Sequence, residues 1–190
     1  MISIESSDGT VFRVHRRHAC ISRLLRDAIS EDSDNDGDND YDINNDNSTD
    51  NHIQDANNDT PMQLINVKSE CLQHIINYMN HYAQDPMNEI PIPLNEEHEH
   101  EQGGASFHNV VPQKWYRDFV NDQESTMLFQ LVTAADYMDI QPLLSLTCLK
   151  VSSNLMGKSS EQIREILNIS KLTPKEEAEA REEHSWMFAD

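Results

Sequence analysis

The residues of this chain that most resemble a metal site lie in a tract rich in Asp and Asn. From Asp32 to Asp38 every second residue is Asp, and Gly37 follows as in the first half of a calcium-binding EF-hand loop. Such a loop also needs an apolar eighth residue and a bidentate Glu at its twelfth position. Those positions hold Asn39 and Ile43. The sequence therefore does not predict a specific calcium site, and we expect no resident metal.

The other reactive side chains do not form a catalytic group. His98 and His100 alternate with glutamates in a polar stretch, which is typical of a solvated loop. Cys148 lies within an apolar helical pattern, which favours packing or an interface over nucleophilic attack. The chain has only five glycines and no Gly-rich phosphate loop. The sequence therefore predicts a protein that is not an enzyme and that binds no cofactor.

Charge and cysteine content narrow the classes of partner. The formal net charge is −20, which disfavours nucleic acid and anionic membrane surfaces because both carry negative charge. No apolar run approaches the ~20 residues of a membrane span. The three cysteines are far apart and lie in apolar contexts, as expected of reduced thiols in the cytoplasm or nucleus. These features disfavour nucleic acid, membranes and disulfide bonds.

The N-terminal half alternates strand and helix patterns. Apolar residues alternate on both sides of Asp8-Gly9, which predicts a β-hairpin over 2–14. A helix is expected near 16–29. A short strand is expected over 63–67, followed by an amphipathic helix that Ser69 caps.

Two acidic stretches interrupt this pattern. The stretch 31–60 contains no Lys or Arg and consists mostly of Asp, Asn and Ser. The stretch 86–108 is rich in Pro, Glu and His. Because such segments bury too little apolar surface to offset their ordering entropy, we predict that both are disordered loops.

The C-terminal third contains four helix signals in close succession. Leu128–Met138 is apolar nearly all round, and Pro142 suits the start of the next helix. Gly157 predicts a helix end, and Ser159 and Thr173 each begin a capping box. These helices carry more apolar surface than so small a bundle can bury. Either the chain covers that surface itself or a partner does.

At these residues the chain resembles the S-phase-kinase-associated (Skp) adaptor family of cullin and F-box ubiquitin ligases. The resemblance covers nearly everything outside the acidic loops. Elongin C shares the N-terminal fold but stops before the last helices. The matching segments, in order, are Ser6-Ser7-Asp8-Gly9 with Phe12, Asn66-Val67, Leu72–Tyr82, Leu128–Ile140, Leu143-Leu144, Thr147-Cys148, Gly157-Lys158, Glu161-x-Ile163-Arg164, Leu167-Asn168-Ile169 and Trp186.

The resemblance implies an α/β fold, with a BTB/POZ-like domain over 1–140 and an F-box-binding helical extension over 141–190. It implies cullin binding through Asp136 and Tyr137; the family has Asn-Tyr there, so Asp136 adds a charge. It also implies that Pro142 is a candidate for 4-hydroxylation, although a proline there equally suits a plain helix start. The implied F-box-binding residues are Leu144, Cys148, Val151, Ile163, Ile166, Leu167, Ile169 and Trp186.

Two functions remain open at this point. The first is the adaptor subunit of an SCF-type E3 ubiquitin ligase, which links a cullin to F-box proteins and forms a homodimer when free of them. The second is a divergent BTB-type interaction module without cullin binding. Both place the protein in the cytoplasm and nucleus.

Overall fold

The computed structural model of the chain describes residues 1–31, 60–91, 107–184 and 186. It divides into two compact units, Met1–Lys150 and Val151–Asp190. The division lies within helix α7 (Gln141–Leu155), later than the predicted boundary between 140 and 141. The reason is that Leu143, Leu146 and Thr147 in the first half of α7 are fully buried.

A three-stranded sheet begins the first unit, with strand order β2-β1-β3. The strands β1 (Ile2–Ser6) and β2 (Val11–Val14) pair antiparallel, as the hairpin pattern predicted, and Gly9 adopts a φ of +81° in the turn. The strand β3 (Met62–Leu64) pairs parallel to β1. It ends before the predicted Val67, whose N–H bonds back to Leu64 in a turn.

The helix expected near 16–29 is two helices, α1 (Arg16–Ala19) and α2 (Arg23–Glu31). Ser22 causes the break. Its buried hydroxyl donates to the Met138 carbonyl at 2.6 Å and accepts from the Leu25 N–H at 3.2 Å. The same side chain therefore begins α2 and ties it to the turn before α7.

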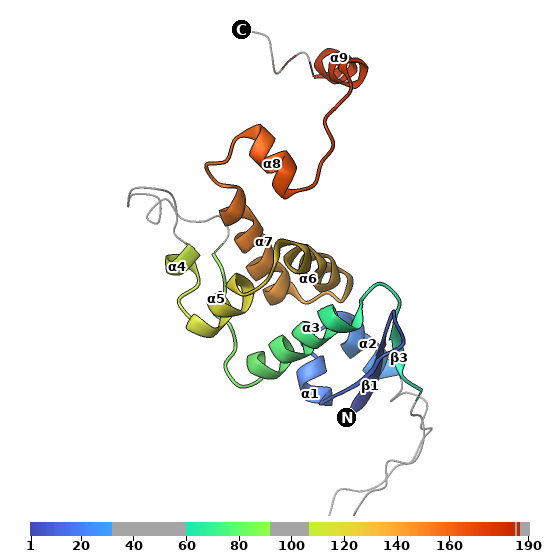
Figure 1. Ribbon diagram of the computed structural model, residues 1–190. Helices are drawn as coiled ribbons and strands as arrows, with labels where there is room; N and C mark the ends of the chain where they lie inside the picture. The colour runs from blue at the N-terminus through green and yellow to red at the C-terminus, as the bar shows by residue number, and fades with distance from the viewer. Residues whose placement is uncertain (32–59, 92–106, 185, 187–190) are drawn as a thin grey trace, which may run out of the picture. The chain divides into compact units, whose positions relative to one another are not determined.

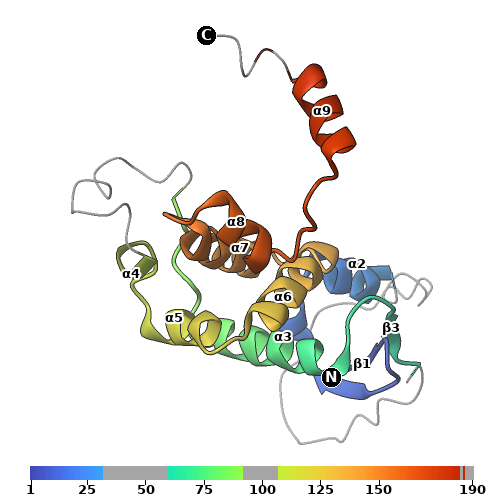
Figure 2. The same cartoon turned by 45° about the horizontal axis from the view of Figure 1, so that its top comes forward.

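Helix α3 (Ser69–Tyr82) is the central helix of the first unit. Figures 1 and 2 show it beside α1 and α6 (Ser125–Tyr137), with the sheet beyond its N-terminal end. The prediction that Ser69 caps α3 is wrong, because Ser69 is its first residue. The cap comes from Asp8 in the β1–β2 turn, whose carboxylate accepts from the Ser69 N–H at 3.2 Å and from its hydroxyl at 2.6 Å.

The segment from Asp85 to Pro91 is ordered, so the predicted disorder from 86 onward is wrong for 86–91. Met87 and Ile90 are buried, and the Asn88 N–H donates to Gln113 at 2.8 Å. Residues 107–108 are also helical, in α4 (Phe107–Val110).

Several sequence expectations lie outside the described residues. They are the calcium-loop pattern, the two histidines at 98 and 100, and the disorder expected over 32–59 and 92–106. Within the described part of the chain, no three His, Cys, Asp or Glu side chains are placed to hold a metal ion. None of the described helices is long and apolar enough to cross a membrane.

The core of the first unit is formed by side chains of the sheet, α3, α5 (Lys114–Asn121), α6 and the start of α7. An aromatic cluster lies at one side of it. Trp115 stacks on His81 and on Phe119, with ring centroids 3.8 and 5.1 Å away, and Tyr78 contacts Phe119 at 5.6 Å. These contacts hold α5 against α3. The α/β class predicted from the sequence is confirmed.

The second unit contains α8 (Ser160–Ile166) and α9 (Pro174–Glu183), and neither helix has a buried residue. Local chemistry defines both. Ser159 and Thr173 form the predicted capping boxes with Gln162 and Glu176. Gly157, with a φ of +70°, follows the end of α7, as predicted.

Candidate protein-docking surfaces

The two residues predicted to meet a cullin occupy the last turn of α6. The Asp136 side chain is exposed, whereas Tyr137 is half-buried and packs partly against the core. The chain leaves α6 through Asp139, which adopts a left-handed φ of 48°. The turn therefore presents one charge and one aromatic edge to solvent on a well-packed base.

Asp136 also influences Cys148 of α7. Burial first, and the Asp136 carboxylate second, raise the pKa of the Cys148 thiol. A thiol with a raised pKa stays protonated at neutral pH and is a poor nucleophile. This agrees with the expectation that Cys148 takes part in contacts and not in catalysis.

Three predicted F-box contacts lie along α7, spaced so that they share one face of the helix. Leu144 and Val151 are half-buried, and Cys148 is exposed. Leu144 also packs against the core of the first unit, so it offers only part of its surface to a partner. Pro142, second in α7, is half-buried.

The other predicted contacts lie in the second unit. Ile163 and Ile166 share one face of α8 by their spacing, and Leu167 is its C-terminal cap residue; all three are half-buried. Ile169 is 54% exposed and Trp186 is 72% exposed. Tryptophan is seldom left so exposed without a role, because its ring contributes strongly when it is buried in an interface.

Sequence analysis missed two further apolar side chains of this unit. Met156 and Leu172 are 53% and 49% exposed. Met156 follows the last residue of α7, and Leu172 precedes the cap of α9. Both lie beside helix ends, where the helical pattern stops, so the spacing of apolar residues did not indicate them.

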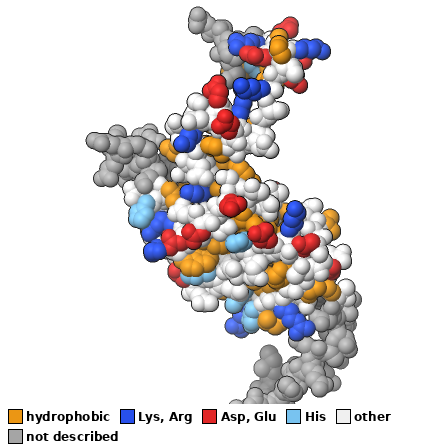
Figure 3. Space-filling view, in the orientation of Figure 1, with side chains coloured by type: hydrophobic (Ala, Val, Ile, Leu, Met, Phe, Trp, Pro, Cys, Tyr) orange, Lys and Arg blue, Asp and Glu red, His pale blue; other side chains and the backbone are white. Residues whose placement is uncertain are grey.

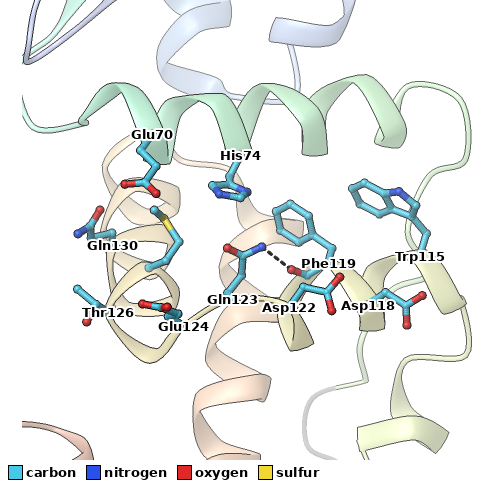
Figure 4. Close-up of a pocket in the computed structure, with 11 residues that line it drawn as sticks. Glu70, His74, Trp115, Asp118, Phe119, Asp122, Gln123, Glu124, Thr126 and Gln130 are labelled. Atoms are coloured by element: carbon cyan, nitrogen blue, oxygen red, sulfur yellow. Dashed lines mark hydrogen bonds between the residues drawn. The ribbon is translucent and has the colours of Figure 1, made fainter.

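A groove in the first unit was also missed. It lies between α3, α5 and the start of α6, with a volume of about 600 Å³ (Figure 4). Its residues are far apart in the sequence, so no local motif indicated it. Figure 3 shows acidic side chains around histidine and hydrophobic ones over the region where these helices meet.

Comparison with known proteins gives full-length relatives. The chain is 30% identical over 187 residues to "SCF ubiquitin ligase complex protein SKP1a" of Dictyostelium discoideum, covering 98% of this chain and 94% of that protein. The chain belongs to the Skp1 family. It is also 31% identical over 189 residues to "SKP1-like protein 1" of Oryza sativa subsp. japonica, covering 99% of this chain and 95% of that relative.

A family model supports the same assignment. The model described as "Skp1 family, dimerisation domain" matches residues 141–187. That range contains all of the predicted F-box contacts. The Skp family resemblance found in the sequence is confirmed.

Proposed function

We propose that this protein is the adaptor subunit of an SCF-type cullin ubiquitin ligase, and that it joins a cullin to F-box substrate receptors. The observation that carries the proposal is the full-length similarity to a protein named as an SCF ubiquitin ligase complex subunit. The protein works by binding two partners at once and catalyses no step itself.

The exposed apolar residues of the second unit are the proposed F-box surface. Within this unit Ile169 and Trp186 are exposed, and Ile163, Ile166 and Leu167 are half-buried. Apolar side chains exposed in the free chain gain free energy when a partner buries them. An F-box, as an apolar helical partner, would bury these exposed apolar side chains.

The end of α6 is the proposed cullin surface. Tyr137 offers an aromatic edge on a rigid base, and the neighbouring Asp136 carboxylate favours a cullin with a basic or hydrogen-bonding group opposite it. Asp136 stands where the resemblance expects an asparagine, so this chain should select among cullins by charge.

Reconstitution tests the proposal. The full chain is mixed with a purified F-box protein and the N-terminal domain of a cullin, and ternary complex is measured by size-exclusion chromatography. Tyr137→Lys should abolish cullin binding and keep F-box binding, because the new charge would lie in a desolvated contact.

The outcomes separate the two candidate functions. If the unsubstituted chain binds F-box protein but no cullin, the adaptor role is wrong and a BTB-type interaction module remains. If Tyr137→Lys loses both partners, the substitution has damaged the fold, and Tyr137→Phe then gives the milder test of the same position.

We further propose that the free chain forms a homodimer through its C-terminal unit. The exposed apolar residues give a reason, and the family model that matches 141–187 carries dimerisation in its name. Sedimentation equilibrium should show a dimer that converts to a one-to-one heterodimer when F-box protein is added.

We propose that the protein acts in the cytoplasm and nucleus.

We also propose that Pro142 is a site of 4-hydroxylation. Pro142 is half-buried in the first turn of α7, so part of its ring is accessible to a modifying enzyme. Peptide mass spectrometry of native protein from normal and low oxygen tests the modification. A peptide that is unmodified in both conditions would exclude it.

A further inference from the structure

The groove of the first unit is built by elements that no short motif links. Glu70 and His74 reach into it from α3, and Phe119 points toward His74 from α5 (Figure 4). Gln123 and Glu124 close the opposite side from the turn between α5 and α6. The Gln123 amide donates to the Phe119 carbonyl at 2.8 Å, which fixes that turn.

The floor of the groove is apolar and aromatic. Phe119 and Met127 are each 9% exposed, so both belong to the core and offer one surface to the groove. Trp115 lies parallel to Phe119, with an interplanar angle of 15°. Stacked aromatic faces beside a methionine bind the aliphatic stem or the planar head of a cationic side chain.

The rim of the groove is acidic. Of the eleven lining residues four are carboxylates, Glu70, Asp118, Asp122 and Glu124, and none is Lys or Arg. Lys114 pairs with Asp118. Within the described residues, the other three carboxylates have no cationic partner. The groove therefore combines an apolar floor with uncompensated negative charge.

We propose that this groove docks a basic, amphipathic segment of a partner protein and receives one of its Arg or Lys side chains. The stem lies on Phe119 and Met127, and the charged head lies among Glu70, Asp122 and Glu124. A volume of about 600 Å³ accommodates such a side chain and its neighbours. A second copy of the chain is a poor occupant of this groove, because its net charge of −20 would add negative charge at an acidic rim, whereas the homodimer proposed above uses the apolar C-terminal unit.

This site differs from both surfaces of the proposed function. Met127 lies in the first turn of α6, whereas Asp136 and Tyr137 lie in its last turn. Trp186 belongs to the second unit. The groove is thus a third docking surface, for a partner whose binding is driven by charge as well as by apolar contact.

The two tryptophans of the chain give a direct test. The full chain is labelled with 5-fluorotryptophan and shows one fluorine resonance for Trp115 and one for Trp186, assigned with Trp186→Phe. The probe is a tryptophan-free helical peptide with Leu on one face and Arg on the other. Its matched control has citrulline in place of each Arg, which keeps the shape and removes the charge.

The Arg peptide should shift the Trp115 resonance and bind about fivefold or more tightly than the citrulline peptide. The double substitution Asp122→Asn with Glu124→Gln should remove that advantage. Glu182→Gln with Glu183→Gln, exposed on α9, removes the same charge elsewhere and should change affinity by less than about twofold.

Three results would overturn the proposal. They are an unmoved Trp115 resonance at saturating peptide, equal binding of the two peptides, and equal loss in the two double variants. The last would mean that the net charge of the chain attracts the peptide without a site. A shift of Trp186 alone would place the peptide on the proposed F-box surface and would leave that function intact.

Discussion

The two units of this protein stabilise their helices in different ways. In the first unit α3 places Leu72, Ile75 and Met79 in a closed core. In the second unit α8 and α9 contain no fully buried residue and depend on capping boxes. Ion pairs four residues apart add to this, as between Lys175 and Glu179 at 3.6 Å. The first unit is folded by its own core, whereas the second is shaped locally and keeps its apolar side chains exposed.

This difference has a physical consequence for binding. Short helices without tertiary packing are marginal in water, and caps contribute only about 1 kcal/mol each. A partner that buries Ile169 and Trp186 therefore supplies packing that the free chain lacks. Binding and ordering of this unit should be coupled, while the first unit stays unchanged.

The largest expected effect is the loss of core packing in the first unit. Leu72→Ala should lower the free energy of unfolding by about 3 kcal/mol, because it leaves a cavity at a fully buried position. Ile166→Ala in α8 removes a half-buried side chain and should cost less than about 1 kcal/mol. Urea unfolding followed by Trp115 fluorescence, in a Trp186→Phe background, measures both. Equal losses would show that the units unfold together.

The second-largest expected effect is on binding and concerns the second unit. Trp186→Ala should leave unfolding unchanged but weaken F-box binding by about 2 kcal/mol, or about 30-fold in Kd, because one buried aromatic often dominates an interface. Isothermal titration against an F-box protein measures the change. Val11→Ala is the matched control, since Val11 is 51% exposed on β2 of the first unit. Unchanged affinity for the Trp186 variant would exclude its proposed role.

Where local chemistry decides, the sequence predicted the structure well. The hairpin at Asp8-Gly9, the stop at Gly157 and the capping boxes at Ser159 and Thr173 all occur as expected. Each depends on residues within a few positions of one another. The second unit consists largely of such signals, so its helices could be placed from the sequence.

The errors arose where distant residues meet. The pattern over 16–29 fits one helix, yet Ser22 bonds to Met138 and divides it. Ser69 looked like a cap, yet Asp8 caps α3 from the neighbouring turn. The acidic groove joins α3 to α5 and α6 and was not anticipated at all. Apolar patterns predict that a helix is buried, but they do not specify which side chains it will meet.

A smaller effect concerns the second unit alone. Thr173→Ala should destabilise α9 by about 1 kcal/mol, because the hydroxyl accepts the Glu176 N–H at 3.3 Å. Hydrogen exchange of the α9 amides should accelerate, while those of α3 stay protected. Ser170→Ala, exposed in the loop before α9, should change neither. Slower exchange or no change in the Thr173 variant would mean that something other than its cap holds α9.

The smallest effect lies at the joint between the sheet and α3. Hydrogen bonds from Ser6 first and Ser69 second lower the pKa of Asp8 from 3.8 to about 2. A carboxylate whose pKa is lower in the folded state stabilises that state above the unfolded pKa, near 4. Its contribution disappears as pH falls through about 2. Asp8→Asn should therefore lower the melting temperature at pH 7, and the gap to the unsubstituted chain should close on acidification through that window.

Asp27→Asn is the control, because the Asp27 carboxylate contacts Arg23 and Arg26 at 3.8 and 4.0 Å and should respond to salt. A gap for Asp8→Asn that salt removes but acid does not would mean that the Asp8 carboxylate acts as a surface charge and not as the cap of α3.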